Sequence, residues 1–158
     1  MAQCRRQFEF NGKISMPFRY LDDRAIADVA FEAWGASLQE LFIAAADATV
    51  NVMISDLSTI QPQEQRHLEL SDSDADMLLF KLLQEIIFYK DADKLLLRVS
   101  ELEIRQQDGL YLVLANACGE RIDVGRHELL VDVKAVTLHR FSLTPTANGW
   151  KTEVVLDV

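Results

Sequence analysis

Two turn dipeptides in the second half of the chain, Asp108-Gly109 and Asn148-Gly149, place the strongest constraint on its fold. Both are signals for two-residue hairpin loops, because Asn, Asp and Gly tolerate the positive φ angles that such loops need. Runs rich in apolar and β-branched residues flank the two dipeptides, at 95–105, 110–117, 129–143 and 150–157. The second half is therefore predicted to consist of antiparallel strands.

The first half of the chain carries two helix signals. Ser37 stands three residues before Glu40, the spacing of a capping box, and an apolar stripe then runs to about Met53. Ser73 likewise precedes Asp76, and leucines and isoleucines follow at helical spacing. Short strands are predicted around these helices, at 18–21, 29–34 and 66–70. Two helices separated by a strand and followed by a run of strands indicate an α+β architecture.

Length and composition fit one soluble domain. The chain has 158 residues, of which 49% are hydrophobic and 26% charged, so it can bury a core without metal or disulfide staples. No signal peptide is recognisable, and no apolar stretch reaches the length that spans a membrane. We therefore expect a cytoplasmic protein that makes no contact with membranes.

The charge of the chain limits its partners. Acidic residues outnumber basic ones by 25 to 16, giving a formal net charge of −9. Tight direct binding to nucleic acid is not expected, because a phosphate backbone selects basic surfaces. An acidic protein can still act on an enzyme of nucleic-acid metabolism through protein contact.

Acidic groups gather near both ends of the chain. Asp22, Asp23 and Asp28 precede an apolar strand, and Asp157 stands beside the α-carboxylate of Val158. If folding brings the two clusters together, they form an all-oxygen pocket that suits Ca²⁺, Mg²⁺ or Mn²⁺. Without a cation, neighbouring acids with no base between them would repel one another. The plainer alternative is a solvated acidic loop and a frayed terminus.

Lys134 is a second candidate functional residue. In the alternating run before it, Val131 and Val133 are predicted to face inward, which leaves Lys134 on the opposite face. The lysine could offset the acidic pocket or contact a partner, and the simpler alternative is an ordinary surface lysine. His127 and His139 are predicted to be structural, since a site made of oxygens needs no imidazole.

Four stretches of the sequence, taken together, resemble the archease family, small cofactor proteins of RNA ligation. The resemblance runs from about Pro17 to Val158 and identifies a divergent, bacterial-type member. Residues 1–16 have no counterpart and are interpreted as an N-terminal extension before an archease-like domain at 17–158, with Met16 as an alternative start. The stretches are Tyr20-Leu21-Asp22-Asp23 to Asp28 with Ala33-Trp34-Gly35, Ser37-Leu38-Gln39-Glu40-Leu41-Phe42 with Ala44-Ala45-Ala46, Gly125-Arg126-His127-Glu128-Leu129 with Lys134-Ala135-Val136-Thr137-Leu138-His139, and Gly149-Trp150 to Leu156-Asp157-Val158.

The resemblance implies a fold, a cation site and an activity. The fold is a mostly antiparallel sheet with two main helices packed on it, built around a strand–helix–strand–strand module. The cation site comprises the opening acid, Asp157 and the carboxylate of Val158. The implied activity is stimulation of an RtcB-type RNA-splicing ligase in tRNA splicing or RNA repair, by a protein that is not itself an enzyme.

The opening motif departs from the family pattern. Where the family has His-Thr-Ala-Asp, this chain has a segment two residues longer, Asp23-Arg24-Ala25-Ile26-Ala27-Asp28. Asp28 aligns with the motif acid and Asp23 with the histidine, so both are candidate ligands.

Two other functions stay open at this point. The acids could hold cations that activate water in a metal-dependent phosphoesterase or other hydrolase, with Arg24 or Arg126 binding substrate. Alternatively, the protein is a chaperone-like binding module in which the metal only fixes the terminus. The sequence does not indicate the oligomeric state.

Overall fold

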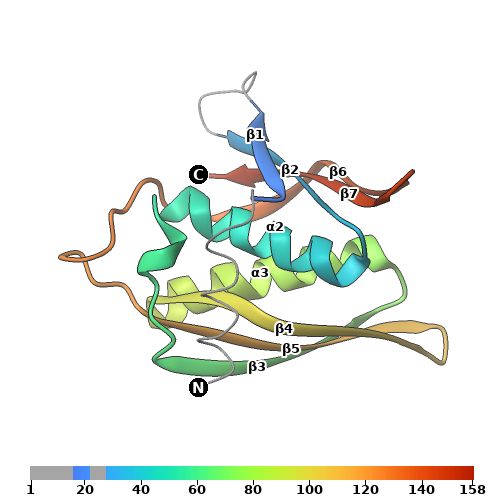
Figure 1. The fold of residues 1–158 in the computed structure, drawn as a ribbon, viewed down its shortest axis with the longest axis horizontal. Coiled ribbons are helices and arrows are strands. Elements are labelled where there is room, and N and C mark those ends of the chain that lie inside the picture. Colours follow the sequence, from blue (N-terminus) through green and yellow to red (C-terminus); the bar gives the residue numbers. More distant parts are fainter. Residues whose placement is uncertain (1–15, 22–27) are drawn as a thin grey trace.

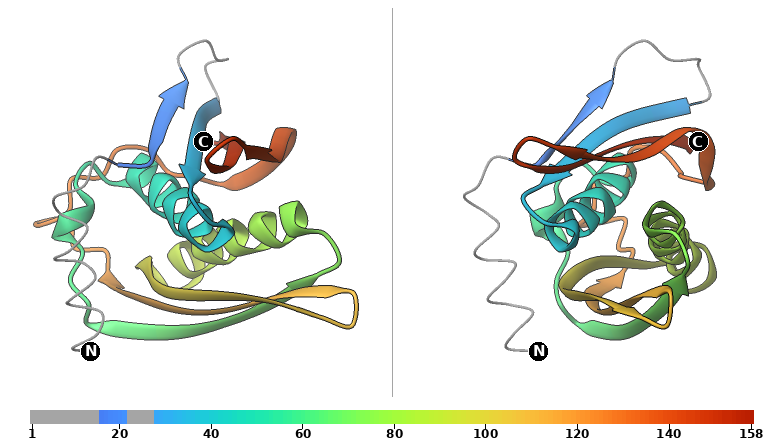
Figure 2. Two further views of the ribbon diagram at one scale, coloured as in Figure 1. Left: turned by 45° about the vertical axis from the view of Figure 1, so that its right-hand side comes forward. Right: turned by 90° about the vertical axis from the view of Figure 1, so that its right-hand side faces the viewer.

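Two antiparallel sheets enclose a layer of helices in the computed structural model, which describes residues 16–21 and 28–158 (Figure 1). The upper sheet has the strand order β1-β2-β7-β6 and the lower sheet the order β3-β5-β4. Figure 2 shows the same three layers from two further directions. The strands are β1 (Phe18–Leu21), β2 (Asp28–Gly35), β3 (Glu64–Asp72), β4 (Leu95–Gln107), β5 (Leu110–Arg121), β6 (Ala135–Thr146) and β7 (Gly149–Asp157).

The helix α2 (Leu38–Met53) begins at the predicted capping box. The Ser37 hydroxyl accepts a hydrogen bond from the Glu40 N–H, and the Glu40 carboxylate accepts one from the N–H of Ala36, at 2.8 Å. Four alanines of α2 are almost completely buried between the two sheets, where small side chains allow close packing. They are Ala44, Ala45, Ala46 and Ala48.

The helix α3 (Ala75–Asp93) begins one residue later than predicted. Its N-cap is Asp74 and not Ser73, and the Asp74 side chain makes no capping hydrogen bond. The helix ends at Lys94, which adopts the left-handed conformation with φ of 54°. Its leucines and isoleucines are buried as expected, and none of the helices in the described residues is long and apolar enough to cross a membrane.

The predicted α+β class and single domain are confirmed, with a different division of the strands. The sequence suggested one sheet, whereas long-range pairing divides the strands between two. The lower sheet and α3 form the expected strand–helix–strand–strand module, in the chain order β3–α3–β4–β5. A short 3₁₀ helix, η2 (Leu57–Thr59), lies between α2 and this module.

The two predicted hairpins are present, with one turn shifted. Asp108 and Gly109 form the β4–β5 turn, and both have positive φ angles, of 52° and 75°. In the β6–β7 hairpin, Thr146 pairs with Gly149, so the loop is Ala147-Asn148 and not Asn148-Gly149.

The strand predicted at 129–143 is wrong in its first part. Residues 130–134 belong to no strand, Leu129 makes only an isolated bridge with Ile54, and β6 starts at Ala135. The segment diverges from β7 because its backbone is bonded to helix α2, where the Leu130 N–H donates to the Met53 carbonyl oxygen at 2.8 Å. Val133 is buried as expected, but Val131 is 43% exposed, which contradicts its predicted inward orientation.

Candidate metal centre

Asp28 and Asp157 meet directly across the β2–β7 strand pair. Asp28 is the first residue of β2 and Asp157 the last residue of β7, and the antiparallel register makes them partners. Directly opposed residues of an antiparallel pair project to the same face, with Cβ atoms about 5 Å apart. Both residues are half-buried. The structure thus brings together two of the predicted site residues from opposite ends of the sequence, and we call them the acid pair.

A second pair of opposed acids on the same strands is neutralised by basic side chains. Glu32 and Glu153 are also register partners in β2 and β7. The Glu32 side chain is only 8% exposed, and it forms ion pairs with Lys151 and Arg19, both at 2.6 Å. Hydrogen bonds from Lys151 and then Arg19 hold the pKa of Glu32 below its ordinary value. At this position the chain's own Lys and Arg side chains supply the positive charge.

The acid pair has no comparable basic neighbour in the described part of the chain. Within residues 16–21 and 28–158, no Lys, Arg or His forms an ion pair with Asp28 or Asp157. Like charges placed directly opposite each other on neighbouring strands are destabilising. A donor set of oxygens with no basic partner among the described residues fits a hard divalent cation.

Two of the remaining predicted residues adjoin the acid pair, one through a backbone hydrogen bond and one as the next residue of the chain. The backbone N–H of Lys134 donates to the carbonyl oxygen of Asp157 at 2.8 Å, and the Lys134 side chain is exposed. Val158 directly follows Asp157 and packs partly against the core. Asp22 and Asp23 lie outside the described residues. In the part that is described, no group of three or more His, Cys, Asp or Glu side chains is arranged to hold a metal ion.

A buried polar cluster that sequence reasoning did not identify fixes the segment between β5 and β6. Glu120 is 2% exposed and accepts hydrogen bonds from the Nε2 of His127, at 2.8 Å, and from Arg126. The Asp123 N–H donates to His127 Nδ1 at 2.9 Å, so the ring proton lies on Nε2. Burial raises the pKa of Glu120, but the hydrogen bonds from Arg126, the Gln61 backbone and His127 outweigh it and lower the pKa overall.

This cluster gives structural roles to His127 and Arg126. His127 is buried and hydrogen-bonded, in line with the structural role predicted for it. Arg126 also donates to the Thr59 carbonyl oxygen at 3.0 Å, so its guanidinium is occupied within the fold. Arg126 is therefore a poor candidate for binding the substrate of a hydrolase. The spacing of Glu120 and Arg126 matches no helix or strand motif that predicts contact, so the sequence pattern did not indicate the cluster.

Comparisons with known proteins show the family and the fold of the chain. Residues 18–158 match the model of the archease protein family (MTH1598/TM1083). Protein archease of Methanosarcina barkeri is 34% identical over 142 residues, covering 89% of this chain and 95% of the relative. Protein archease of Methanothermobacter thermautotrophicus is 35% identical, covering 89% of this chain and 98% of the relative.

Two solved structures share the fold. The solution structure of Methanobacterium thermoautotrophicum protein 1598 superposes with a TM-score of 0.79 at 32% identity, covering 91% of this chain and 100% of that one. The crystal structure of a Thermotoga maritima archease, described as a possible chaperone, has a TM-score of 0.60 at 17% identity, covering 89% of this chain and 100% of that one, and supports the fold alone. From the family match over nearly its whole length and from relatives above 30% identity, this chain belongs to the archease family.

Proposed function

We propose that this protein is a metal-binding, non-catalytic cofactor that stimulates an RtcB-type RNA-splicing ligase in tRNA splicing or RNA repair. The observation that carries the proposal is the direct pairing of Asp28 with Asp157 at the end of the upper sheet. Membership of the archease family supports it. The chain's overall acidity also supports it, because an enzyme that holds RNA presents a positive face to its partners.

The proposed cation is held by Asp28, Asp157 and the carboxylate of Val158, with Asp23 as a further candidate ligand. Carboxylate oxygens favour Ca²⁺, Mg²⁺ or Mn²⁺ over softer metals. When bound, the cation supplies positive charge where the two strands otherwise place only acids. Lys134 is proposed to contact the partner from the same end of the sheet, since its side chain is exposed and its backbone is bonded to Asp157.

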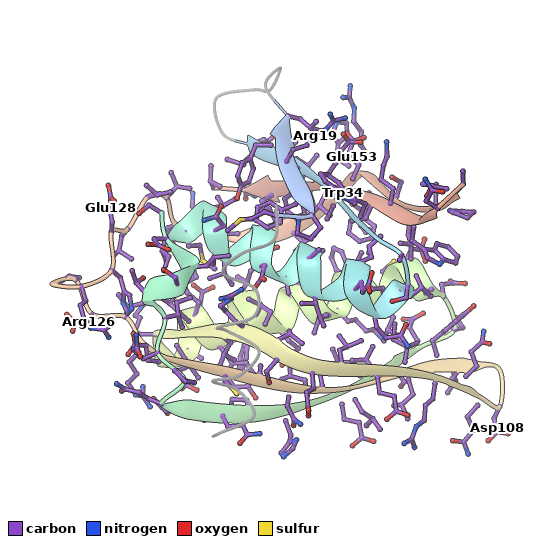
Figure 3. The ribbon with its side chains drawn as sticks, in the orientation of Figure 1. Arg19, Trp34, Asp108, Arg126, Glu128 and Glu153 are labelled. Atoms are coloured by element: carbon purple, nitrogen blue, oxygen red, sulfur yellow. The ribbon has the colours of Figure 1, made fainter. Side chains whose placement is uncertain are left out.

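The acid pair is tested by the guanylylation of a purified ligase with GTP and Mn²⁺, with and without this protein. Asp28→Ala and Asp157→Ala are each expected to abolish the stimulation while the protein stays folded. Asp108→Asn is the matched control, because Asp108 lies in the β4–β5 turn at the other end of the molecule and Asn suits its positive φ (Figure 3). Full stimulation by both alanine variants would refute the mechanism.

Cation binding is tested on the isolated protein by denaturant unfolding in chelator and in Ca²⁺ or Mn²⁺. A cation that binds only the folded state raises the free energy of unfolding by about 2.7 kcal/mol at a hundredfold excess over its Kd. Asp28→Asn keeps the shape of the side chain and removes its charge, so the dependence on cation should disappear. An equal response of the wild type and this variant would count against the site.

A further inference from the structure

The hydroxyl group of Thr137 in β6 is buried without a hydrogen-bond partner in the part of the chain that the structure describes. The residue as a whole is partly exposed, but its Oγ1 atom is not. Burying a hydroxyl that makes no hydrogen bond is unfavourable, so such a group usually pairs with a ligand, an ion or an ordered water. The Thr137 hydroxyl therefore indicates a contact that the described residues do not supply.

Other buried threonine hydroxyls find their partners inside the protein. Thr49 in α2 is completely buried and donates to the Ala45 carbonyl oxygen at 2.9 Å. Thr152 in β7 is also completely buried, and its hydroxyl donates to the Ser142 carbonyl oxygen at 2.6 Å. Thr152 belongs to the same sheet as Thr137. This sheet can thus pair a buried hydroxyl with its own backbone, and at Thr137 it does not.

The strand register places Thr137 on the same face of the upper sheet as the acid pair. Thr137 directly opposes Val155, and Ala135 directly opposes Asp157. Directly opposed residues project to the same face, and so do residues two apart in one strand. Figure 3 shows Glu153, which alternates with these positions in β7, on the side of the sheet away from the helices. The hydroxyl and the acid pair therefore share the outer face.

The neighbours of Thr137 on this face leave the acid pair as the place to look for its partner. Val155 and Ala30, in the same cross-strand row, are apolar and buried. The diagonal neighbours on β7 are Glu153 and Asp157, at about 7–8 Å. Glu153 accepts no hydrogen bond from Thr137. On the other side stands Asp157, with its partner of the acid pair one strand further away.

We propose that the Thr137 hydroxyl is a further part of the cation site, where it forms a hydrogen bond with a water of the bound cation. This inference rests on the proposed function and adds a residue to its site. A cation such as Mg²⁺ is commonly held by one or two carboxylates and keeps several of its waters. A water polarised by a cation is a strong donor, and the hydroxyl oxygen can accept from it. Thr137 is thus a positioning residue that acts on the cation through its water.

The test measures Mn²⁺ affinity and stability for Thr137→Val, in which the side chain keeps its shape and loses its hydroxyl. Calorimetric titration of the isolated protein should show a Kd for Mn²⁺ that is roughly tenfold higher, as for the loss of a group that orients the ligands of a metal. In chelator, the variant should be as stable as the wild type or more stable, because an unpaired buried polar group has been removed. Thr137→Ser restores a hydroxyl and should restore the affinity.

Thr152→Val is the matched control. It is the same substitution in the same sheet, but it removes a hydroxyl that has a partner inside the protein. We expect it to lower the midpoint of denaturant unfolding both in chelator and in Mn²⁺, because the Ser142 carbonyl oxygen loses its hydrogen bond. Its Kd for Mn²⁺ should equal that of the wild type. The two valine variants therefore change different measurements.

The outcomes separate this inference from the proposed function. If the wild type binds Mn²⁺ and Thr137→Val binds it equally tightly, the inference is overturned and the cation site stands. If the wild type binds no Mn²⁺, or if Asp28→Asn binds it as tightly as the wild type, the cation site and this inference fail together. If Thr137→Val is less stable than the wild type in chelator or does not fold, the hydroxyl has a structural partner, which also overturns the inference.

Discussion

At the scale of single residues, the two pairs of opposed acids on β2 and β7 differ in whether basic side chains neutralise them. Asp28 and Glu32 are four residues apart in the same strand, and each faces an acid on β7. Glu32 is neutralised by Lys151 and Arg19, whereas the described residues provide no such neutralisation for Asp28. Among the described residues, β1 and β7 supply basic partners to Glu32 and none to Asp28. This difference gives Glu32 a stabilising role and supports the proposal that Asp28 binds a ligand.

Glu32→Gln should lower the free energy of unfolding at pH 7 by about 1–2 kcal/mol, a modest value because Arg19 and Lys151 are themselves about half exposed or more. The folded-state pKa of Glu32 is depressed, so its contribution is complete above the unfolded pKa of roughly 4.3 and is lost as the pH falls through the folded pKa. Denaturant unfolding from pH 7 to pH 3 should show that the difference in the free energy of unfolding between wild type and variant becomes smaller in the acid range.

Glu153→Gln is the control for this experiment. Glu153 opposes Glu32 in the register and forms no ion pair with another described residue, so its neutral variant should be as stable as the wild type or slightly more stable. If the free energies of unfolding of wild type and Glu32→Gln differed by the same amount down to pH 3, the role given to Arg19 and Lys151 would be contradicted.

At the scale of elements, local signals predicted the helices and turns well because their causes are local. The capping box of α2 and the Asp108-Gly109 turn each depend on residues within a few positions of one another. The segment at 129–134 has the alternation of a strand, yet its backbone bonds to α2, α3 and Asp157, which are far away in the sequence. No local pattern encodes such contacts, and the same holds for the cluster around Glu120.

The β6–β7 hairpin provides a prediction at this scale, through Gly149. Its φ is 151°, and a Cβ atom there would lie 2.1 Å from the carbonyl oxygen of Gly35 and 2.8 Å from the Cα of Ala36. Gly149→Ala should therefore lower the free energy of unfolding by more than about 2 kcal/mol, because backbone strain and a backbone clash act together. Thermal or denaturant unfolding measures the change.

Gly109→Ala separates the two causes. Gly109 also has a positive φ, of 75°, but a Cβ atom added there would meet nothing within 4 Å, so only the conformational penalty of about 1–2 kcal/mol applies. If both alanine variants lost the same stability, the close approach of Gly149 to Gly35 would have no energetic effect, contrary to the prediction.

At the scale of the whole molecule, each sheet belongs to a strand–helix–strand–strand unit with the same topology. One of these two units is inserted into the chain of the other. The units β3–α3–β4–β5 and β2–α2–β6–β7 have the spatial orders β3-β5-β4 and β2-β7-β6. The first unit lies in the chain between α2 and β6 of the second. The sequence shows no repeat, because the likeness lies in strand order and not in residue identity. Only the long-range pairing reveals it, which is why one sheet was expected and two were found.

The inserted unit should not fold alone. A fragment of residues 61–122 loses α2, whose Asp47 pairs with Arg98 of β4 through hydrogen bonds of 3.0 and 2.9 Å. It also loses the segment after β5 that binds Lys90 of α3. The fragment is expected to show no cooperative thermal transition by circular dichroism, whereas the whole chain should melt in a single transition. A sigmoidal melt of the fragment would show that the two units are independent.

The insertion also determines when the acid pair can exist. During translation β2 is synthesised before the inserted unit and β7 after it. Asp28 can therefore pair with Asp157 only after all the intervening elements have been synthesised. A nascent chain that lacks β7 can present one carboxylate, but never the two side by side. The pair is therefore assembled only after translation has passed the inserted unit, and any step that depends on it must wait until then.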